Sequence, residues 1–123
     1  MAADELAGAR AARRFAEGVI DRWAVRPGVA DEACLVVSEL VTNAFAHGRS
    51  DAVLRLLRRN GLLRVEVLDE DTRMPVIVVP DPDSLSGRGL ALVASLATLW
   101  GAERTAYGKV VWAEFDVCDR RAP

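Results

Sequence analysis

The sequence is poor in the residues that build thiolate metal sites and redox centres. Its 123 residues include two cysteines, Cys34 and Cys118, which form no CxxC pair and have no histidine close to them. Metal-thiolate and redox-motif functions are therefore disfavoured. We expect Cys34, near the apolar face of a predicted helix, to be a small core residue. A reducing cytoplasm is the simplest compartment for such a chain.

Targeting and membrane-spanning patterns are also missing. Residues 1–5 carry no basic stretch followed by an apolar core, so we expect no signal peptide. The longest apolar-rich run, 90–100, is too short to cross a bilayer. Neither sign of charge is in large excess: 16 basic and 18 acidic residues give a net charge of −2, which argues against a general nucleic-acid or membrane-surface partner.

The sequence does contain enough apolar side chains for a core. Its hydrophobic content of 51% is typical of an ordered globular protein. A chain of this length buries roughly two thirds of its unfolded surface. We therefore predict one domain over residues 1–123, with residues 1–3 and 119–123 disordered.

The spacing of the apolar residues predicts an α/β sandwich. In chain order, the predicted elements are helices over 5–23 and 29–47, strands over 52–59 and 62–69, a helix over 90–99 and strands over 102–105 and 110–117. Asn60-Gly61 is the strongest hairpin signal. The proline-rich segment 70–86 is irregular, with room for one short strand at 76–79. Because the strands come in adjacent pairs, we predict a two-layer α+β sandwich whose mixed, mostly antiparallel sheet carries helices on one face.

A polar stripe runs along the second predicted helix. Glu39, Asn43 and His47 are spaced four residues apart, so they line up on one flank of the apolar face. A carboxylate can accept a proton, an amide oxygen can ligate Mg²⁺, and an imidazole can contact phosphate. Taken alone, the same stripe is also what a solvated helix surface looks like.

Two other polar clusters stand at the ends of predicted elements. Asp69 ends an apolar strand, where its carboxylate can accept hydrogen bonds from an exocyclic amine such as that of adenine; a simple turn residue is the alternative. Residues 86–90, Ser-Gly-Arg-Gly-Leu, open a helix whose free N–H groups and dipole favour an anion. Glycines let that backbone approach a phosphate closely, although a structural turn would use the same residues.

In this order, the three motifs resemble those of the GHKL ATPase/kinase superfamily, which has the Bergerat ATP-binding fold. The most specific parts are SELVTNAxxHG at 38–48 and GRGLALV at 87–93. The resemblance covers nearly the whole chain, from about 4 to 117. Within the superfamily, the sequence looks most like the small bacterial anti-sigma-factor serine/threonine kinases.

The resemblance implies a role for each motif position, with ATP and Mg²⁺ as cofactors. Glu39 matches the general base that activates the attacking hydroxyl or water, Asn43 the Mg²⁺ ligand, and Asp69 the aspartate that reads the adenine amine. His47 matches a position near the phosphates. The glycine box that wraps the phosphates matches Gly87, Arg88, Gly89 and Leu90. The end of an ATP lid would precede it at 84–86.

Some positions depart from the family's pattern. The adenine-side box DxGxG here reads Asp69-Glu70-Asp71-Thr72-Arg73, without its glycines. Kinase members often carry a basic residue just before the glycine box, and here only Arg88 could substitute for it. Relatives have a threonine that helps to fix the adenine aspartate; the expected match is Val110, whose missing hydroxyl would cost about 0.5–1.5 kcal/mol. Relatives usually begin with a strand that often takes part in dimer contacts, and none is predicted here, so a homodimer stays an open option.

The resemblance implies a cytoplasmic ATP-binding regulator. It would transfer the ATP γ-phosphate to a serine of a small antagonist protein and would sequester a sigma factor in a competing state, with no direct nucleic-acid or membrane partner. The alternative is a pseudokinase that acts as a protein-binding module; Glu39 favours the enzyme, whereas Val110 and the altered box favour the module. A histidine kinase catalytic domain is disfavoured, because the chain is too short for a dimerisation helix pair and its single histidine, His47, lies in the nucleotide motif.

Arginines gather in the first predicted hairpin. They are Arg55, Arg58, Arg59 and Arg64. A solvated face is the simpler explanation for this cluster, and a docking patch for an acidic partner is the alternative.

Overall fold

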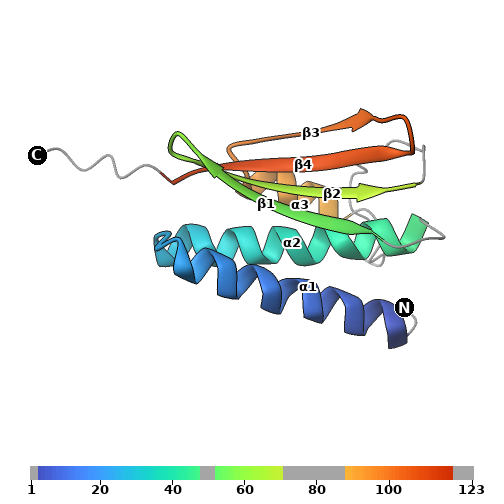
Figure 1. The fold of residues 1–123 in the computed structure, drawn as a ribbon, viewed down its shortest axis with the longest axis horizontal. Helices are drawn as coiled ribbons and strands as arrows, with labels where there is room; N and C mark the ends of the chain where they lie inside the picture. The colour runs from blue at the N-terminus through green and yellow to red at the C-terminus, as the bar shows by residue number, and fades with distance from the viewer. Residues whose placement is uncertain (1–2, 48–51, 71–87, 118–123) are drawn as a thin grey trace, which may run out of the picture.

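The computed structural model describes residues 3–47, 52–70 and 88–117, with every side chain in these ranges except those of residues 3–6, 46, 47 and 88. In chain order, the elements are α1 (Ala3–Arg22), α2 (Pro27–His47), β1 (Val53–Arg59), β2 (Leu62–Asp69), α3 (Arg88–Leu96), β3 (Leu99–Arg104) and β4 (Lys109–Asp116). The strands form one sheet in the order β1-β2-β4-β3 (Figure 1). All neighbouring pairs are antiparallel, so the described sheet is not mixed.

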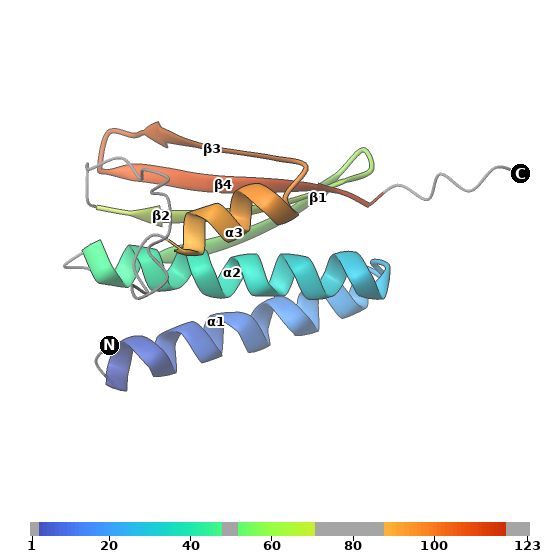
Figure 2. The ribbon, with the colours of Figure 1, turned by 180° about the vertical axis from the view of Figure 1, so that it is seen from behind.

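The predicted α+β architecture is confirmed, including the order of its helices and strands. The three helices lie on the same side of the sheet (Figures 1 and 2). α2 and α3 contact the strands, whereas α1 packs along α2 on the side away from the sheet. Within the described ranges, no helix is long and apolar enough to span a membrane. The predicted strand at 76–79 and the tail at 119–123 lie outside the described residues.

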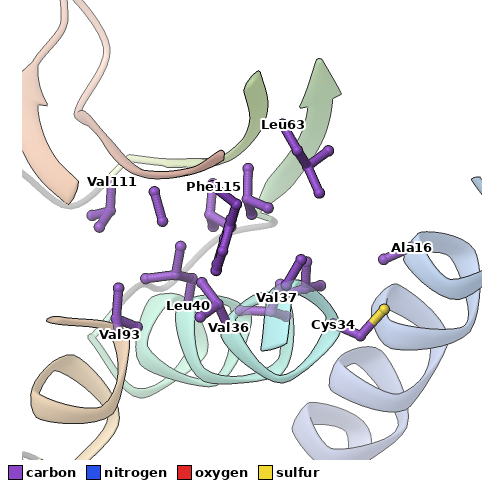
Figure 3. Close-up of a cluster of buried hydrophobic side chains, with 14 of the residues drawn as sticks. Ala16, Cys34, Val36, Val37, Leu40, Leu63, Val93, Val111 and Phe115 are labelled. Carbon is purple, nitrogen blue, oxygen red and sulfur yellow. The ribbon is translucent and has the colours of Figure 1, made fainter. Parts of the chain in front are cut away.

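The hydrophobic core lies between α2 and the sheet (Figure 3). Val36, Val37 and Leu40 of α2 pack with Leu63 of β2 and Phe115 of β4, and all five side chains are at most 2% exposed. Burying a large apolar side chain stabilises a fold by about 1.5–3 kcal/mol. The helical period of α2 and the two-residue period of the strands therefore meet in one interface.

The alternation in β2 and β4 also decides which polar side chains face the helices. In both strands, buried residues alternate with less buried ones. On the buried side, β2 runs through Val65 and Val67 to Asp69, and β4 begins at Lys109 and continues with Val111. Among the described residues, Asp69 and Lys109 are the buried charged ones. The sheet thus carries two opposite charges into the space beside the helix layer.

Local backbone chemistry sets several element boundaries. Asn60 (φ 52°) and Gly61 (φ 79°) have the left-handed backbone of a two-residue hairpin turn, as predicted. After α1, Ala24 also takes a left-handed φ, of 56°. α2 then begins at Pro27, two residues earlier than predicted. Proline suits the first position of a helix, because the N–H group that it lacks would have no partner inside the helix there.

Other predicted boundaries are wrong by a few residues. α3 ends at Leu96, not at 99, because the N–H of Thr98 donates to the carbonyl oxygen of Glu114 and leads the chain into the sheet. β3 consequently begins three residues before the predicted strand over 102–105. At the other end of the chain, residue 3 is already helical rather than disordered.

Candidate functional site

The first part of the candidate site is the contact between α2 and the first turn of α3. Glu39 and Asn43 lie one helical turn apart on α2, and both are partly exposed. Gly89 approaches them so closely that a Cβ atom on it would lie 2.8 Å from Glu39 Oε2 and 3.3 Å from Asn43 Nδ2. The structure therefore brings together a carboxylate, an amide and a glycine backbone that the sequence singled out in separate motifs.

The absence of a side chain at residue 89 permits this approach. A Cβ atom placed there would come closer to Glu39 than real Cβ atoms do, so the glutamate would have to move. Leu90, the next residue, is 6% exposed and belongs to the core, where it anchors the start of α3. The first N–H groups of a helix have no partner inside the helix, and together with its dipole they favour an anion.

Burial affects the proton affinity of Glu39. Desolvation beside α3 raises the pKa of this carboxyl above the ordinary value of 4.5. A carboxylate with a raised pKa holds a proton more strongly than a solvated one, which makes it a more effective general base while it is ionised. The position of Glu39 therefore suits proton abstraction from a hydroxyl group.

The second part of the candidate site is a buried ion pair at the end of the sheet. Asp69, the last residue of β2, stands directly opposite Lys109, the first residue of β4. Lys109 Nζ donates to Asp69 Oδ1 over 2.9 Å, and the two side chains are 5% and 2% exposed. Sequence reasoning selected Asp69 and missed Lys109. The alternation of buried positions at 109, 111, 113 and 115 was the signal that could have identified it.

The register corrects the prediction for Val110. Val110 stands opposite Leu68, not opposite Asp69, and belongs to the less buried face of β4. Lys109, one residue away, contacts the aspartate. A missing hydroxyl at Val110 therefore does not leave Asp69 without support, because the lysine supplies a charged donor.

The turn between β3 and β4 packs tightly against the end of β2. A Cβ atom on Gly108 would lie 2.0 Å from the carbonyl oxygen of Asp69 and 2.6 Å from Cα of Glu70. Both of these are backbone atoms, which cannot rotate away. Gly108 therefore lets the two strand ends meet closely enough for the Asp69–Lys109 pair to form.

The two parts of the site lie toward the same end of the molecule. In Figures 1 and 2, the end of α2, the start of α3 and the end of β2 are found on the same side, at the left in Figure 2. Of the other predicted site residues, His47 is the last residue of α2 and Arg88 is the first residue of α3. The structure does not describe the side chains of these two residues. Gly87 and the predicted lid end at 84–86 also lie outside the described residues.

The arginines of the first hairpin are largely engaged by neighbouring groups. Arg64 donates to Glu66 over 2.8 Å and to Glu114 over 2.9 Å. Arg55 pairs with Glu66 over 3.5 Å, and Arg58 donates to a backbone carbonyl at the end of α1. These contacts favour a solvated sheet surface over a docking patch for an acidic partner.

Comparison with known proteins identifies a family and similar solved structures. A family model described as the histidine kinase-like ATPase domain matches residues 2–115. Among solved structures, the chain is similar to the histidine kinase domain from the blue-light activated histidine kinase EL346 of Erythrobacter litoralis, with 31% identity and a TM-score of 0.53. That similarity covers 72% of this chain and 45% of the other, so this chain spans less than half the length of its structural relative. No curated protein sequence matches significantly.

Proposed function

Because the chain belongs to the histidine kinase-like ATPase family, we propose that it binds Mg·ATP and phosphorylates a serine of a small antagonist protein. ATP binding is expected of this family, whereas phosphate transfer to a protein is the part of the proposal that goes beyond it. The observation that supports this step is the contact of Glu39 and Asn43 with the Gly89 backbone, in which a carboxylate lies next to groups of the types suited to Mg²⁺ and phosphate.

The residues of the first part fit a magnesium-bound triphosphate. The start of α3 offers backbone N–H groups, and glycine at residue 89 places no side chain between that backbone and Glu39 and Asn43. The side-chain oxygen of Asn43 is of the type that ligates Mg²⁺, and an ion held by one protein ligand completes its shell with phosphate oxygens and water. Gly87, Arg88 and His47 are expected, from the resemblance, to contact the phosphates as well.

Each side chain has a distinct task in this proposal. Bound ATP would supply the phosphoryl group, with Mg²⁺ neutralising its charge. Glu39 would take the proton from the hydroxyl of the partner's serine, and its raised pKa suits that task. Asn43 would orient the metal, and Leu90 would hold the start of α3 in the core. Asp69 would accept a hydrogen bond from the adenine amine.

The regulatory role includes binding to other proteins. In the proposed scheme, the protein sequesters a sigma factor in one state and modifies the antagonist in another, in the cytoplasm, with homodimerisation as an open option. The second candidate function is a pseudokinase that holds the same partners without turnover. The altered box at 69–73, which lacks the family's glycines, favours this candidate. The argument from Val110 no longer does, because Lys109 contacts Asp69.

The test is a phosphate-transfer assay with purified antagonist and radiolabelled ATP, comparing wild type, Glu39→Gln and Asn43→Ala. Glu39→Gln keeps the shape of the side chain but removes the base, so transfer should fall by about 10²–10⁴-fold while ATP affinity changes by a few fold. Asn43→Ala should lose both binding and transfer. A wild-type protein that binds ATP and a sigma factor but transfers no phosphate to its cognate antagonist would support the pseudokinase instead.

A further inference from the structure

We infer that Lys109 is a positioning residue that gives the proposed ATP site its preference for adenine. It does so through Asp69, whose carboxylate it holds in one orientation. This inference rests on the proposed function, because it concerns the nucleobase end of the same site. The observation behind it is the buried pair between the end of β2 and the start of β4.

Stability alone does not account for this pair. Both side chains are almost fully buried, at 2% for Asp69 and 5% for Lys109. Taking two charges out of water costs about as much as their attraction returns, so apolar residues of similar size would serve the core as well or better. The rest of the helix-facing side of β2 and β4 is in fact apolar. A role in recognition gives a reason for charges at this one position.

The chemistry of the pair explains how it would select a base. An ammonium group has hydrogen-bond donors and no acceptor, so the carboxylate that faces it must accept. We expect that carboxylate to act as an acceptor toward the nucleobase as well. Adenine carries an amine donor at its 6-position, whereas hypoxanthine and guanine carry a carbonyl oxygen there. A carboxylate held as an acceptor binds the amine and repels the carbonyl. Without Lys109, the Asp69 carboxylate would be free to turn away from the base, and the discrimination between the two groups would be lost.

The local geometry makes this orientation rigid. Asp69 and Lys109 are opposite each other in the ladder, and Gly108 packs against the backbone of Asp69. Backbone and side chain are therefore both constrained at this end of the sheet. The neighbouring Val110 belongs to the other face of β4, which provides a control position one residue away.

The test measures the affinity of the full chain for ATP and for ITP, which differ at the 6-position of the base. Wild type should prefer ATP by roughly tenfold or more, as expected for a hydrogen bond to a charged group. Lys109→Met should reduce this preference to less than about threefold, whereas Lys109→Gln, whose amide still donates to Asp69, should keep most of it. Val110→Thr should leave both affinities unchanged.

A purely structural role for Lys109 would give a different pattern. Lys109→Met would then weaken ATP and ITP by the same factor, with the preference intact, and that result would overturn the inference. Loss of the preference in Lys109→Gln would do the same. If wild type binds neither ATP nor ITP at millimolar concentration, the proposed ATP site is wrong, and the inference is wrong with it. If wild type and Lys109→Met both bind with the same preference for ATP, the ATP site stands and only the inference about Lys109 is wrong.

A second readout does not depend on the stability of Lys109→Met. Lys109 is the single lysine of the chain, so ¹⁵N-lysine labelling gives one side-chain Nζ signal. This signal should shift on saturation with ATP and shift less with ITP, because only the adenine amine shares the Asp69 carboxylate with Lys109. Equal shifts with the two nucleotides, or none with ATP, would contradict the inference.

Discussion

The two parts of the candidate site are held in place in different ways. Where α2 meets α3, partly exposed side chains face a glycine backbone, and the contact depends on the missing side chain of Gly89. At the ends of β2 and β4, two buried charges face each other in register, 2.9 Å apart. The first part can adjust by moving a side chain, whereas the sheet fixes the second. Substitutions in the sheet part should therefore cost stability, and those in the helix part mainly binding and chemistry.

The largest loss of stability is expected for Lys109→Met. Removing one partner leaves the Asp69 carboxylate buried without its ammonium group, and breaking a buried pair in this way costs about 3–5 kcal/mol. The double variant Lys109→Met/Asp69→Leu should recover most of that loss, because it removes the carboxylate that Lys109→Met leaves without its ammonium partner. Urea unfolding followed by circular dichroism measures both. A double variant no more stable than Lys109→Met would show that the cost lies elsewhere.

Gly108→Ala should lower the free energy of unfolding by about 3 kcal/mol, since the new methyl group would overlap backbone atoms of β2 that cannot rotate away. Gly18→Ala is the matched control. Gly18 lies in α1 with nothing within 4 Å of its would-be Cβ. The control should gain about 0.5–1 kcal/mol from its helix propensity. Similar thermal shifts for the two variants would argue against the close packing at Gly108.

Gly89→Ala sharpens the contrast between the two parts. Its nearest neighbours are the ends of the Glu39 and Asn43 side chains, which can move, so the change in unfolding free energy should be less than about 1 kcal/mol. ATP affinity should nevertheless fall by roughly tenfold, because the methyl group would crowd the proposed phosphate site. Calorimetric titration measures the affinity. A large loss of stability with unchanged binding would reverse our assignment of the two parts.

The smallest effect concerns the pH dependence of Glu39. Because its pKa is raised by folding, the ionised carboxylate destabilises the folded state, and this cost appears as the pH rises from the ordinary value of 4.5 through the raised one. Glu39→Gln cannot ionise, so it should be slightly more stable than wild type at pH 7. The difference should shrink as the pH falls toward 4.5. A difference that stays constant between these pH values would contradict the role of burial.

Sequence reasoning located the helix part of the site more completely than the sheet part. Glu39 and Asn43 share one helix, whose period alone places them on one flank, and the glycines of the next motif marked its partner. The ion pair depends instead on the alignment of two strands that are distant in the sequence. Val110 was selected by matching a threonine position of the family, and a shift of one residue exchanges the two faces of a strand, so that match missed Lys109.

The same distinction applies to the fold. The Asn60-Gly61 hairpin could be predicted because its turn chemistry is local. The end of α3 could not, because Leu96 through Leu99 are compatible with a helix, and a hydrogen bond from Thr98 to distant Glu114 ends it. Ala24, with its left-handed φ, carried no signal either, since alanine rarely adopts that backbone. Element boundaries that depend on tertiary contacts are therefore the ones that were predicted incorrectly from the sequence.

The most direct test of the central claim is a calorimetric titration of the full chain with ATP, in the presence and absence of Mg²⁺. If Asn43, Gly89 and Asp69 together form a nucleotide site, wild type should bind ATP in a Mg²⁺-dependent manner and prefer it over GTP. Asn43→Ala should lose the Mg²⁺-dependent binding, and Asp69→Asn should weaken binding by roughly tenfold or more, because half of its acceptor becomes a donor. An absence of binding at millimolar ATP in the folded wild type would contradict the account.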